Sequence, residues 1–464
     1  MELSRIAETL SPSQVVGNTA VEISDLTYDT RAVSPGALFF CVRGARFDGH
    51  ELADRAIDAG AAGLVVEHPV ASRVPQLVVE DSRRAMAAAA VEFFEHPSDE
   101  LEVAAVTGTN GKTTTAFLLY SILDAAGRKP GLLGTIESRV GGEIRPAIRT
   151  TPEAIDLQRT FREMLDIGDR SAAMEATSHG SELGRLDGIR FSSLAFTNLT
   201  QDHLDLHGTM EAYFEAKRRL FLDSRPPAAI NVGDPWGRKL AEDRPDAMTY
   251  GFADDAELRP EALDGIDLKL KGGFNLENAL AAMASARLLG IDDEAIARGL
   301  ETVDGVPGRF EAVDEGQPFT VLVDYAHTPD SLENVLATAR EITSGRLICV
   351  FGCGGDRDRE KRPIMGRIAA ELADVAIVTS DNPRSEDPGA IIDEIVAGID
   401  RDAEIVQDRR SAIAHAIETA EPDDVVVIAG KGHEQGQQFR DRTVPFDDRE
   451  VAREALRRLG AATT

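Results

Sequence analysis

Residues 106–115 of the sequence read VTGTNGKTTT, and they join an apolar run, LEVAAVTG, to a segment with a helical pattern, TTTAFLLYSILDAAG. The glycines allow a tight turn in which backbone N–H groups and the start of a helix face anionic oxygens. Lys112 adds a positive charge for the β- and γ-phosphates of a nucleotide, and Thr113 or Thr114 can bring a hydroxyl group to magnesium. A strand, a phosphate loop and a helix in this order begin a parallel, helix-covered sheet. We therefore predict an α/β fold that binds ATP, against the alternative of a purely structural turn.

Two further α/β regions flank this loop. Before it, residues 27–67 have the pattern of a strand, a turn, a second strand and an alanine-rich helix, and after it strands and helices alternate to the end of the chain. A chain of 464 residues is also too long to fold around a single hydrophobic core. We expect three domains: a small N-terminal α/β domain at residues 1–98, a central P-loop ATPase-like parallel sheet at 99–308, and a C-terminal Rossmann-like doubly wound domain at 309–464.

The composition excludes several classes of partner. With 80 acidic and 50 basic residues, the formal net charge of -30 argues against a general nucleic-acid or anionic-membrane surface. No run of about 18 apolar residues occurs, and the N-terminal MELSRIAETL lacks the basic start of a signal peptide, so we expect a cytoplasmic protein without membrane insertion. Cys41, Cys349 and Cys353 lie in or beside apolar segments, and we interpret them as buried residues rather than disulfide partners or metal ligands.

The phosphate loop is shorter than the usual GxxxxGK[ST] pattern, because only Thr109 and Asn110 separate its two glycines. In this form it resembles the loop of the Mur ligase family, ATP-dependent enzymes that form amide bonds in peptidoglycan assembly. The resemblance runs through nearly the whole chain, in the motifs MEATSHG, TNLTQDHLDLHG, EAYFEAKRRLF, GGFNLENALAA, GVPGRFE, VDYAHTPDSLENVL, FGCGGDRDREKRP, SDNPRSEDP and GKGHE. It implies a ligase, which we expect to be a monomer, that joins meso-diaminopimelate to the D-glutamate side-chain carboxylate of UDP-N-acetylmuramoyl-L-alanyl-D-glutamate. An acyl phosphate formed from ATP with Mg²⁺ would activate that carboxylate.

Such chemistry gathers negative charge, so the site needs cations and metal. The resemblance implies catalytic roles for Lys112, Glu175, His203 and Lys217, with Lys217 carbamylated to N6-carboxylysine. It implies Thr114, Glu175, His203 and Lys217 as metal ligands. On its own, the AKRRLF segment favours a solvated Lys217, and His203 could be a core or helix-start histidine. A buried lysine, however, tends to lose its proton, and a neutral amine can take up carbon dioxide.

The family motifs also imply the residues that hold the nucleotide. These ATP contacts are Gly108, Thr109, Asn110, Gly111, Lys112, Thr113, Thr114, Asn278, Arg309 and Asp324. Helix capping is the alternative for the neighbouring Asn275. Asp324 and His327 follow a predicted strand, at the edge where open α/β sheets place their ligands.

A third set of residues matches those that contact the UDP-muramoyl dipeptide in the family. The set comprises Thr30, Ala45, Arg46, Phe47, Thr150, Thr151, Thr177, Ser178 and Arg185. Two neighbouring positions depart from some members of the family, because Arg149 replaces asparagine and Leu183 replaces glutamine. These departures put single contacts in doubt.

The amino-acid pocket is the most decisive part of the sequence for specificity. The resemblance implies that it is built by Arg357, Asp381, Asn382, Pro383, Arg384, Gly430 and Glu434. An arginine fork can pair with the extra carboxylate that diaminopimelate has and lysine lacks, and Glu434 suits the distal ammonium group. The alternative for Arg384 is an exposed arginine in a proline turn.

Other functions remain open at this point. A ligase of the same fold could add lysine or another diamino acid, and a noncatalytic nucleotide-binding relative could retain the fold. Folate polyglutamate ligation is disfavoured by the DNPR and GKGHE segments. Because the phosphate loop and the amino-acid residues fall in different predicted domains, we expect catalysis to require domain closure.

Overall fold

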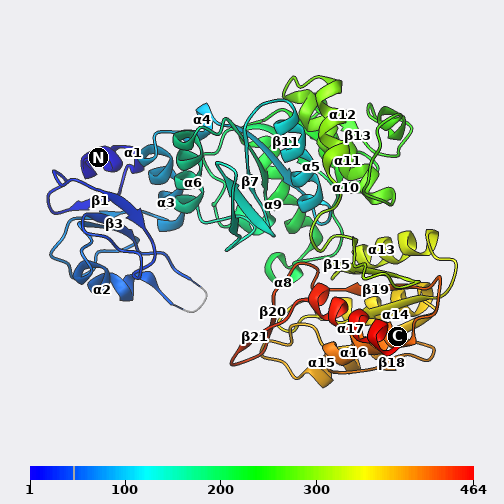
Figure 1. Ribbon diagram of the computed structural model, residues 1–464. Coiled ribbons are helices and arrows are strands. Elements are labelled where there is room, and N and C mark those ends of the chain that lie inside the picture. Colours follow the sequence, from blue (N-terminus) through cyan, green and yellow to red (C-terminus); the bar gives the residue numbers. More distant parts are fainter. Residues whose placement is uncertain (45–46, 464) are drawn as a thin grey trace.

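The computed structural model describes residues 1–44 and 47–463, which form three large sheets in chain order and a fourth sheet of two strands (Figure 1). We name the parts of the chain around these sheets the N-terminal, central and C-terminal regions. The predicted mixed α/β class, with a parallel-rich sheet in each part, is confirmed. Among the described residues, no helix combines the length and the apolar character needed to cross a membrane.

The N-terminal region has five strands in the order β1-β5-β4-β3-β2, with only β1 antiparallel to its neighbour. Helices α1 and α3 pack on one face and α2 on the other, each against a separate apolar cluster. Its elements are α1 (Leu3–Leu10), β1 (Gln14–Val16), β2 (Asp25–Thr27), β3 (Ala37–Phe40), η1 (Gly49–Leu52), α2 (Ala53–Asp58), β4 (Gly63–Val66), β5 (Gln76–Val78) and α3 (Ser82–Phe93).

The central region has an eight-stranded sheet in the order β13-β12-β11-β6-β10-β7-β8-β9. Helices α5, α11 and α12 cover one face, and α6 and α9 cover the other. The strands are β6 (Glu102–Thr107), β7 (Pro130–Leu133), β8 (Glu137–Val140), β9 (Glu143–Pro146), β10 (Ser171–Glu175), β11 (Phe191–Phe196), β12 (Ala228–Asn231) and β13 (Met248–Tyr250). The helices are α4 (Pro97–Glu100), α5 (Lys112–Ala125), α6 (Ala154–Ile167), α7 (Ser178–Glu182), α8 (Leu204–His207), α9 (Met210–Leu222), α10 (Pro235–Asp243), η2 (Pro260–Leu263), α11 (Gly273–Leu288) and α12 (Asp293–Thr302).

One edge of this central sheet differs from the parallel arrangement that the sequence predicts. Strands β7, β8 and β9 pair antiparallel, and Val140 lies opposite Glu143 across a two-residue turn. Both turn residues, Gly141 and Gly142, have positive φ angles, of 57° and 82°, as a two-residue hairpin requires. The segments ESRV and EIRP contain too few apolar residues for the sequence to predict edge strands there.

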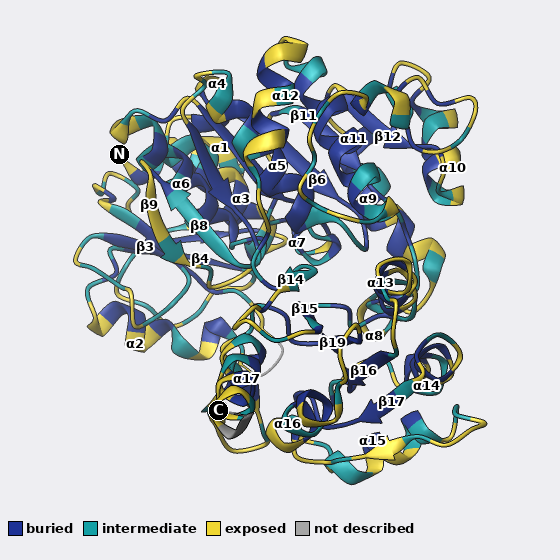
Figure 2. Ribbon diagram, turned by 45° about the vertical axis from the view of Figure 1, so that its right-hand side comes forward, coloured by how far each residue is buried: buried dark blue, intermediate teal, exposed yellow. Residues whose placement is uncertain are grey.

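The C-terminal region contains a six-stranded sheet in the order β14-β15-β19-β16-β17-β18, parallel except at β14. Helices α13, α14 and α15 lie against one face, while α16 and α17 lie against the other, so the predicted doubly wound arrangement is confirmed. Figure 2 shows the buried strands β16 and β17 among these helices. The strands are β14 (Glu311–Ala312), β15 (Thr320–Asp324), β16 (Leu347–Phe351), β17 (Val375–Val378), β18 (Glu404–Ile405), β19 (Val425–Ala429), and the hairpin β20 (Gly436–Gln438) and β21 (Thr443–Pro445). The helices are α13 (Pro329–Glu341), α14 (Lys361–Leu372), α15 (Pro388–Val396), α16 (Arg409–Thr419) and α17 (Asp448–Thr463).

Candidate active site

The phosphate loop connects β6 to α5, as the sequence predicts. Gly108 has φ +154°, and a Cβ atom there would lie 1.8 Å from Oγ1 of Thr197. At Gly111, with φ +84°, a Cβ atom would lie 2.2 Å from Oδ1 of Asn278. Both glycines are therefore required by close neighbours as well as by the turn. Helix α5 begins at Lys112, so its free N–H groups face the loop.

A cleft of about 1060 Å³ opens beside this loop and is lined by residues of both the central and the C-terminal regions. It brings together most of the predicted ATP contacts and four of the predicted dipeptide contacts. The predicted residues along its wall are Thr109, Asn110, Gly111, Lys112, Thr113, Thr114, Thr150, Thr151, Glu175, Thr177, Arg185, His203, Asn278, Arg309, Asp324 and Arg357.

Two lysines meet under the loop. The ammonium group of Lys112 donates to the carbonyl oxygens of Gly108, at 3.0 Å, and Thr109, at 2.8 Å. Lys217, on α9, donates to the same Gly108 oxygen at 2.8 Å and lies over the ring of Tyr213. Burial lowers the pKa of both lysines, and the charge of Lys112 lowers that of Lys217 further. Lys217 is buried, so the solvated surface position that its helix pattern favours is wrong.

Oxygen donors suited to magnesium lie beside the loop. Glu175 ends β10, and its carboxylate accepts hydrogen bonds from the backbone N–H of Thr135 at 2.7 Å and from its hydroxyl at 3.0 Å. Thr114 lines the same cleft from α5. Within the part of the chain that the structure describes, no three His, Cys, Asp or Glu side chains gather as a ready-made metal site. Hydroxyl and carboxylate oxygens nevertheless fit Mg²⁺, which usually completes its shell with phosphate oxygens and water.

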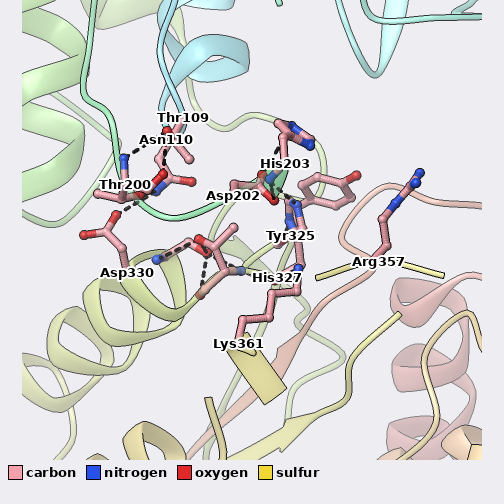
Figure 3. A network of polar contacts seen from close by, with 12 residues as sticks. Thr109, Asn110, Thr200, Asp202, His203, Tyr325, His327, Asp330, Arg357 and Lys361 are labelled. Atoms are coloured by element: carbon pink, nitrogen blue, oxygen red, sulfur yellow. Dashed lines mark hydrogen bonds and ion pairs between the residues drawn. The ribbon is translucent and has the colours of Figure 1, made fainter. Parts of the chain in front are cut away.

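Asp202 and His203 form a polar network with the C-terminal region (Figure 3). His203 has a left-handed backbone, with φ +56°, and its Nε2 lies 3.3 Å from Oδ2 of Asp202. Nε2 of His327 lies 3.9 Å from the same oxygen, and the Lys361 ammonium donates to the His327 carbonyl at 2.8 Å. Burial lowers the pKa of His203 to about 3, so the ring is neutral and one of its two nitrogens can accept. Burial raises the pKa of Asp202, but the positive charge of Lys361 and the hydrogen bond from the His203 backbone N–H outweigh burial, so the pKa is lowered and the carboxyl stays ionised.

Besides the contact of Asp202 with His327, four contacts among the described residues join the phosphate-loop side of the cleft to the C-terminal region, and Figure 3 shows the first of them. The Asn110 amide donates to the Asp330 carboxylate at 2.6 Å. The guanidinium of Arg309 donates to the Thr113 hydroxyl at 3.0 Å and lies over the ring of Tyr325. The other two contacts are Gln201 with Asp358, at 2.9 Å, and Arg357 with Asp205, at 3.7 Å.

Asn278 and Asp324, two of the predicted ATP contacts, make different hydrogen bonds. Asn278, on α11, lines the cleft and donates to Oδ1 of Asn275 at 3.1 Å. Asn275 in turn donates to the carbonyl of Lys271, so it braces the start of the helix. Asp324 accepts hydrogen bonds from the backbone N–H groups of Phe310 and Ala326, each at 2.6 Å. Burial raises the pKa of Asp324, while Arg309 and these two donors partly offset that rise.

The predicted dipeptide contacts separate into two groups. Thr151, Thr177 and Arg185 are held together: the Thr177 hydroxyl donates to that of Thr151 at 3.0 Å, and Arg185 donates to the Thr151 carbonyl. Ser178 is buried next to them, at the start of α7. Thr30 and Phe47 lie in the N-terminal region and do not line the cleft. Ala45 and Arg46 lie outside the described residues.

A buried carboxylate that the sequence analysis did not single out organises this group. Glu153 pairs with Arg185 at 2.8 Å and with Arg83 of α3 at 2.8 Å, and it approaches Arg149 at 3.4 Å. Glu153 therefore ties the N-terminal region to the central region and fixes Arg185 at the cleft. Its position immediately before α6 carries no sequence signal that predicts three arginine partners.

The predicted amino-acid residues gather at the carboxyl ends of strands in the C-terminal sheet. Arg384 has φ +52° and donates to the Gly355 carbonyl at 2.6 Å. A Cβ atom on Gly354 would lie 2.9 Å from Nη1 of Arg384 and 3.9 Å from Cγ of Arg357, so the two arginines are neighbours. Burial and the charge of Arg357 lower the pKa of Arg384. The positive charges of two neighbouring arginines favour an anion beside them.

The GKGHE segment approaches the DNPR segment closely. Gly430 has φ +118°, and a Cβ atom there would lie 2.5 Å from Oδ2 of Asp381. Asn382 donates to Oε2 of Glu434 at 2.8 Å. The structure therefore brings all the predicted amino-acid residues except Arg357 into one connected group, and that group does not line the large cleft. Arg357 belongs to the wall of the cleft and links the two.

Family models for Mur ligases match three stretches of this chain. The Mur ligase family catalytic domain matches residues 22–98, the Mur ligase middle domain residues 106–286, and the Mur ligase glutamate ligase domain residues 308–432. The chain therefore belongs to the Mur ligase family, and it is an ATP-dependent ligase.

Individual relatives narrow the comparison. The UDP-N-acetylmuramoyl-L-alanyl-D-glutamate–2,6-diaminopimelate ligase of Geobacter metallireducens is 46% identical over 99% of both chains. The ligase of the same name from Clostridium tetani is 42% identical and covers 99% of this chain and 100% of its own. A solved structure of a ligase with that name is 32% identical, with a TM-score of 0.67, and covers 100% of this chain and 99% of its own. MurF from Acinetobacter baumannii, at 21% identity and a TM-score of 0.67, shares the fold.

Proposed function

We propose that this ligase joins meso-diaminopimelate to the D-glutamate side-chain carboxylate of UDP-N-acetylmuramoyl-L-alanyl-D-glutamate, with ATP converted to ADP and phosphate. The observation that carries the proposal is the neighbouring pair Arg357 and Arg384, with Glu434 near enough to Arg384 that its charge partly offsets the lowering of the Arg384 pKa by burial. A diamino acid with a distal carboxylate and a distal ammonium group matches this combination of two cations and one carboxylate. The relatives whose names contain 2,6-diaminopimelate support the same substrate.

The reaction follows from the groups along the cleft. Lys112 and the N–H groups at the start of α5 would hold the β- and γ-phosphates, and Arg309 beside Thr113 would reach a phosphate from the C-terminal region. The dipeptide would lie along Thr150, Thr151, Thr177 and Arg185, with its free carboxylate toward the phosphate loop. Attack by a carboxylate oxygen on the γ-phosphorus would release ADP, and the amine would then displace phosphate from the acyl phosphate.

Magnesium would be held by Thr114, Glu175 and His203, together with carbamylated Lys217. When bound, it would neutralise charge that develops on the phosphate oxygens. The surroundings of Lys217 support carbamylation, because burial and the nearby Lys112 both favour its neutral amine. A carbamate on Lys217 would also be attracted to the neighbouring Lys112 ammonium group.

We further propose that the protein works as a cytoplasmic monomer with the domain boundaries predicted from the sequence. Thr30, Ala45, Arg46 and Phe47 would contact the UDP end of the substrate from the N-terminal region. Their distance from the catalytic residues along the chain suits a long substrate that spans two regions.

An isotope experiment tests the reaction. The UDP-dipeptide is prepared with ¹⁸O in its D-glutamate side-chain carboxylate and incubated with the enzyme, ATP, Mg²⁺ and meso-diaminopimelate. We expect one ¹⁸O atom in each phosphate released and a product with the mass of the tripeptide conjugate. Absence of product with all substrates saturating would favour a noncatalytic nucleotide-binding protein, and unlabelled phosphate would exclude the acyl phosphate.

A further inference from the structure

Lys431 is a fully buried lysine at the centre of the amino-acid group, and the sequence analysis did not assign it a role. It lies in the GKGHE segment just after β19, between Gly430 and Gly432. Its ammonium group donates to Oε2 of Glu434 at 2.8 Å and to Oδ1 of Asn382 at 3.0 Å. Both partners belong to the group predicted to bind the incoming amino acid.

Both hydrogen bonds that the Glu434 carboxylate accepts go to the same oxygen, Oε2. Lys431 and the amide of Asn382 both donate to Oε2, each at 2.8 Å. Among the described residues, no hydrogen bond to Oε1 is found, and the side chain of Glu434 is 31% exposed. A carboxylate anchored through one oxygen presents its other oxygen in a fixed direction, which suits a ligand that carries an ammonium group.

Asn382 is fixed by the same lysine. Its Oδ1 accepts from Lys431 and from the backbone N–H of Gln438, at 2.9 Å, so its amide nitrogen is turned toward Glu434. The neighbouring Arg384 donates its backbone N–H to the Gln438 carbonyl at 3.0 Å. One buried cation therefore connects the carboxylate end of the pocket, at Arg384, to the ammonium end, at Glu434.

We propose that Lys431 is a positioning and specificity-determining residue for the amino-acid substrate. It orients Glu434 so that the free carboxylate oxygen binds the distal ammonium group of a diamino diacid. This inference rests on the proposed function and adds a residue to its substrate pocket. Lys431 itself does not contact the substrate, because its ammonium is enclosed by protein and directed at Glu434 and Asn382.

A purely structural role is the competing explanation, because a buried cation can simply hold a loop in place. The two explanations differ in which substrate they affect. L-2-Aminopimelate keeps the distal carboxylate that would face Arg384 but lacks the distal ammonium group. Loss of Glu434 orientation should weaken only the substrate with the ammonium group, whereas a distorted loop should weaken both.

The test compares the two substrates in the full-length enzyme with saturating ATP and UDP-dipeptide. For Lys431→Met we expect the KM for meso-diaminopimelate to rise about tenfold or more, as loss of a charged hydrogen bond implies, while the KM for L-2-aminopimelate changes less than about twofold. The KM for ATP should stay at the wild-type value. Equal increases for both amino acids, or no increase for either, would overturn the assignment.

A second variant covers the case in which Lys431→Met does not fold. Glu434→Gln alters a partly exposed side chain and should remove most of the preference for meso-diaminopimelate. Lys431→Gln keeps a hydrogen-bond donor but no charge, and on its own it should lower the preference for meso-diaminopimelate over L-2-aminopimelate. In the Glu434→Gln enzyme, the same change should alter that preference by less than about twofold further. Additive effects would contradict action through Glu434.

Arg244→Met provides a matched control, because Arg244 is also a buried cation but contacts Phe221, Pro226 and Asp246, away from the cleft. It should lower stability without changing the ratio of the two KM values. If the wild-type enzyme forms no product from meso-diaminopimelate, the proposed function fails together with this inference. If it forms product but the ratio does not respond to Lys431→Met, only the role of Lys431 fails.

Discussion

At the phosphate loop, the carbonyl oxygen of Gly108 accepts from both Lys112 and Lys217. The two lysines differ in surroundings, since Lys112 lines the cleft and Lys217 is buried beneath it. This difference suggests separate tasks within one site: Lys112 is placed to neutralise a phosphate, and Lys217 is placed to lose its proton.

Replacement of Lys112 tests the first task. We expect Lys112→Ala to lower kcat about 100-fold or more, because a preorganised cation that stabilises transition-state charge is removed. Phosphate release with all substrates saturating measures the effect. Lys239→Ala, which removes an exposed lysine of α10, should retain wild-type activity. Wild-type kcat in Lys112→Ala would contradict the assignment.

Replacement of Lys217 by arginine tests the second task. Arginine keeps a positive charge and a long side chain but cannot form a carbamate, so we expect activity to fall about 100-fold. Intact-protein mass spectrometry at high bicarbonate should detect the added carboxyl group in the wild-type protein only. An active Lys217→Arg enzyme would show that a carbamate is not needed.

Sequence patterns predict some residues of the site and miss others. The glycines, Lys112 and Thr113 follow from a local motif, because the loop's chemistry depends on neighbours in the chain. Lys431, Asp330 and Glu153 do not, since each also contacts a residue far along the chain: Asn382, Asn110 and Arg83, which lie 49, 220 and 70 residues away. Their roles depend on tertiary packing, which one sequence does not display.

Among the elements of the C-terminal region, β19, α16 and α17 meet at a fully buried ion pair. Arg409, at the start of α16, contacts Asp448, at the start of α17, through two hydrogen bonds of 2.8 and 2.7 Å. Arg409 also donates to the carbonyl of Ala429 at 2.8 Å, immediately before Gly430. The pair therefore fixes the strand end that carries the amino-acid group.

Breaking this ion pair should destabilise the region strongly. We expect Arg409→Met to cost about 3–5 kcal/mol, because Asp448 is left buried without its cation. Hydrogen–deuterium exchange of residues 425–429 measures the local loss. The double variant Arg409→Met with Asp448→Asn should recover part of it, and Arg457→Met, at an exposed pair with Glu315, should leave exchange of these residues at the wild-type rate. A double variant less stable than Arg409→Met would contradict this explanation.

Elements with strong apolar periodicity were predictable from the sequence, and polar ones were not. The buried strands β6, β16 and β19 are continuous apolar runs, and their order with the helices fixed the α/β class. The antiparallel strands β8 and β9 and the hairpin β20–β21 are short and polar, so their pairing depends on turn geometry and neighbouring strands.

Across the whole molecule, the cleft depends on how the central and C-terminal regions are joined. Asn110 with Asp330 and Gln201 with Asp358 bridge them by hydrogen bonds. Asn110 is one of the two residues that distinguish this phosphate loop from longer ones. The loop therefore contacts the C-terminal region directly. A nucleotide bound to the loop should for this reason affect the position of that region.

Removal of both bridges should favour separation of the regions. We expect Gln201→Ala with Asp330→Ala to cost about 2 kcal/mol, which shifts the equilibrium toward separated regions about 30-fold. Small-angle X-ray scattering of the nucleotide-free variant should give a larger radius of gyration than wild type. ATP with the UDP-dipeptide should restore the wild-type value, and an unchanged radius without ligands would contradict a bridging role.

The substrate assignment can be tested most directly by competition. The enzyme is given ATP, Mg²⁺, the UDP-dipeptide, and equal concentrations of meso-diaminopimelate and L-lysine. Mass spectrometry then measures the amounts of the two amino-acid conjugates. We expect the diaminopimelate conjugate to exceed the lysine conjugate at least about tenfold, because only diaminopimelate supplies the carboxylate that Arg384 would bind. A product that is mainly the lysine conjugate would contradict the account.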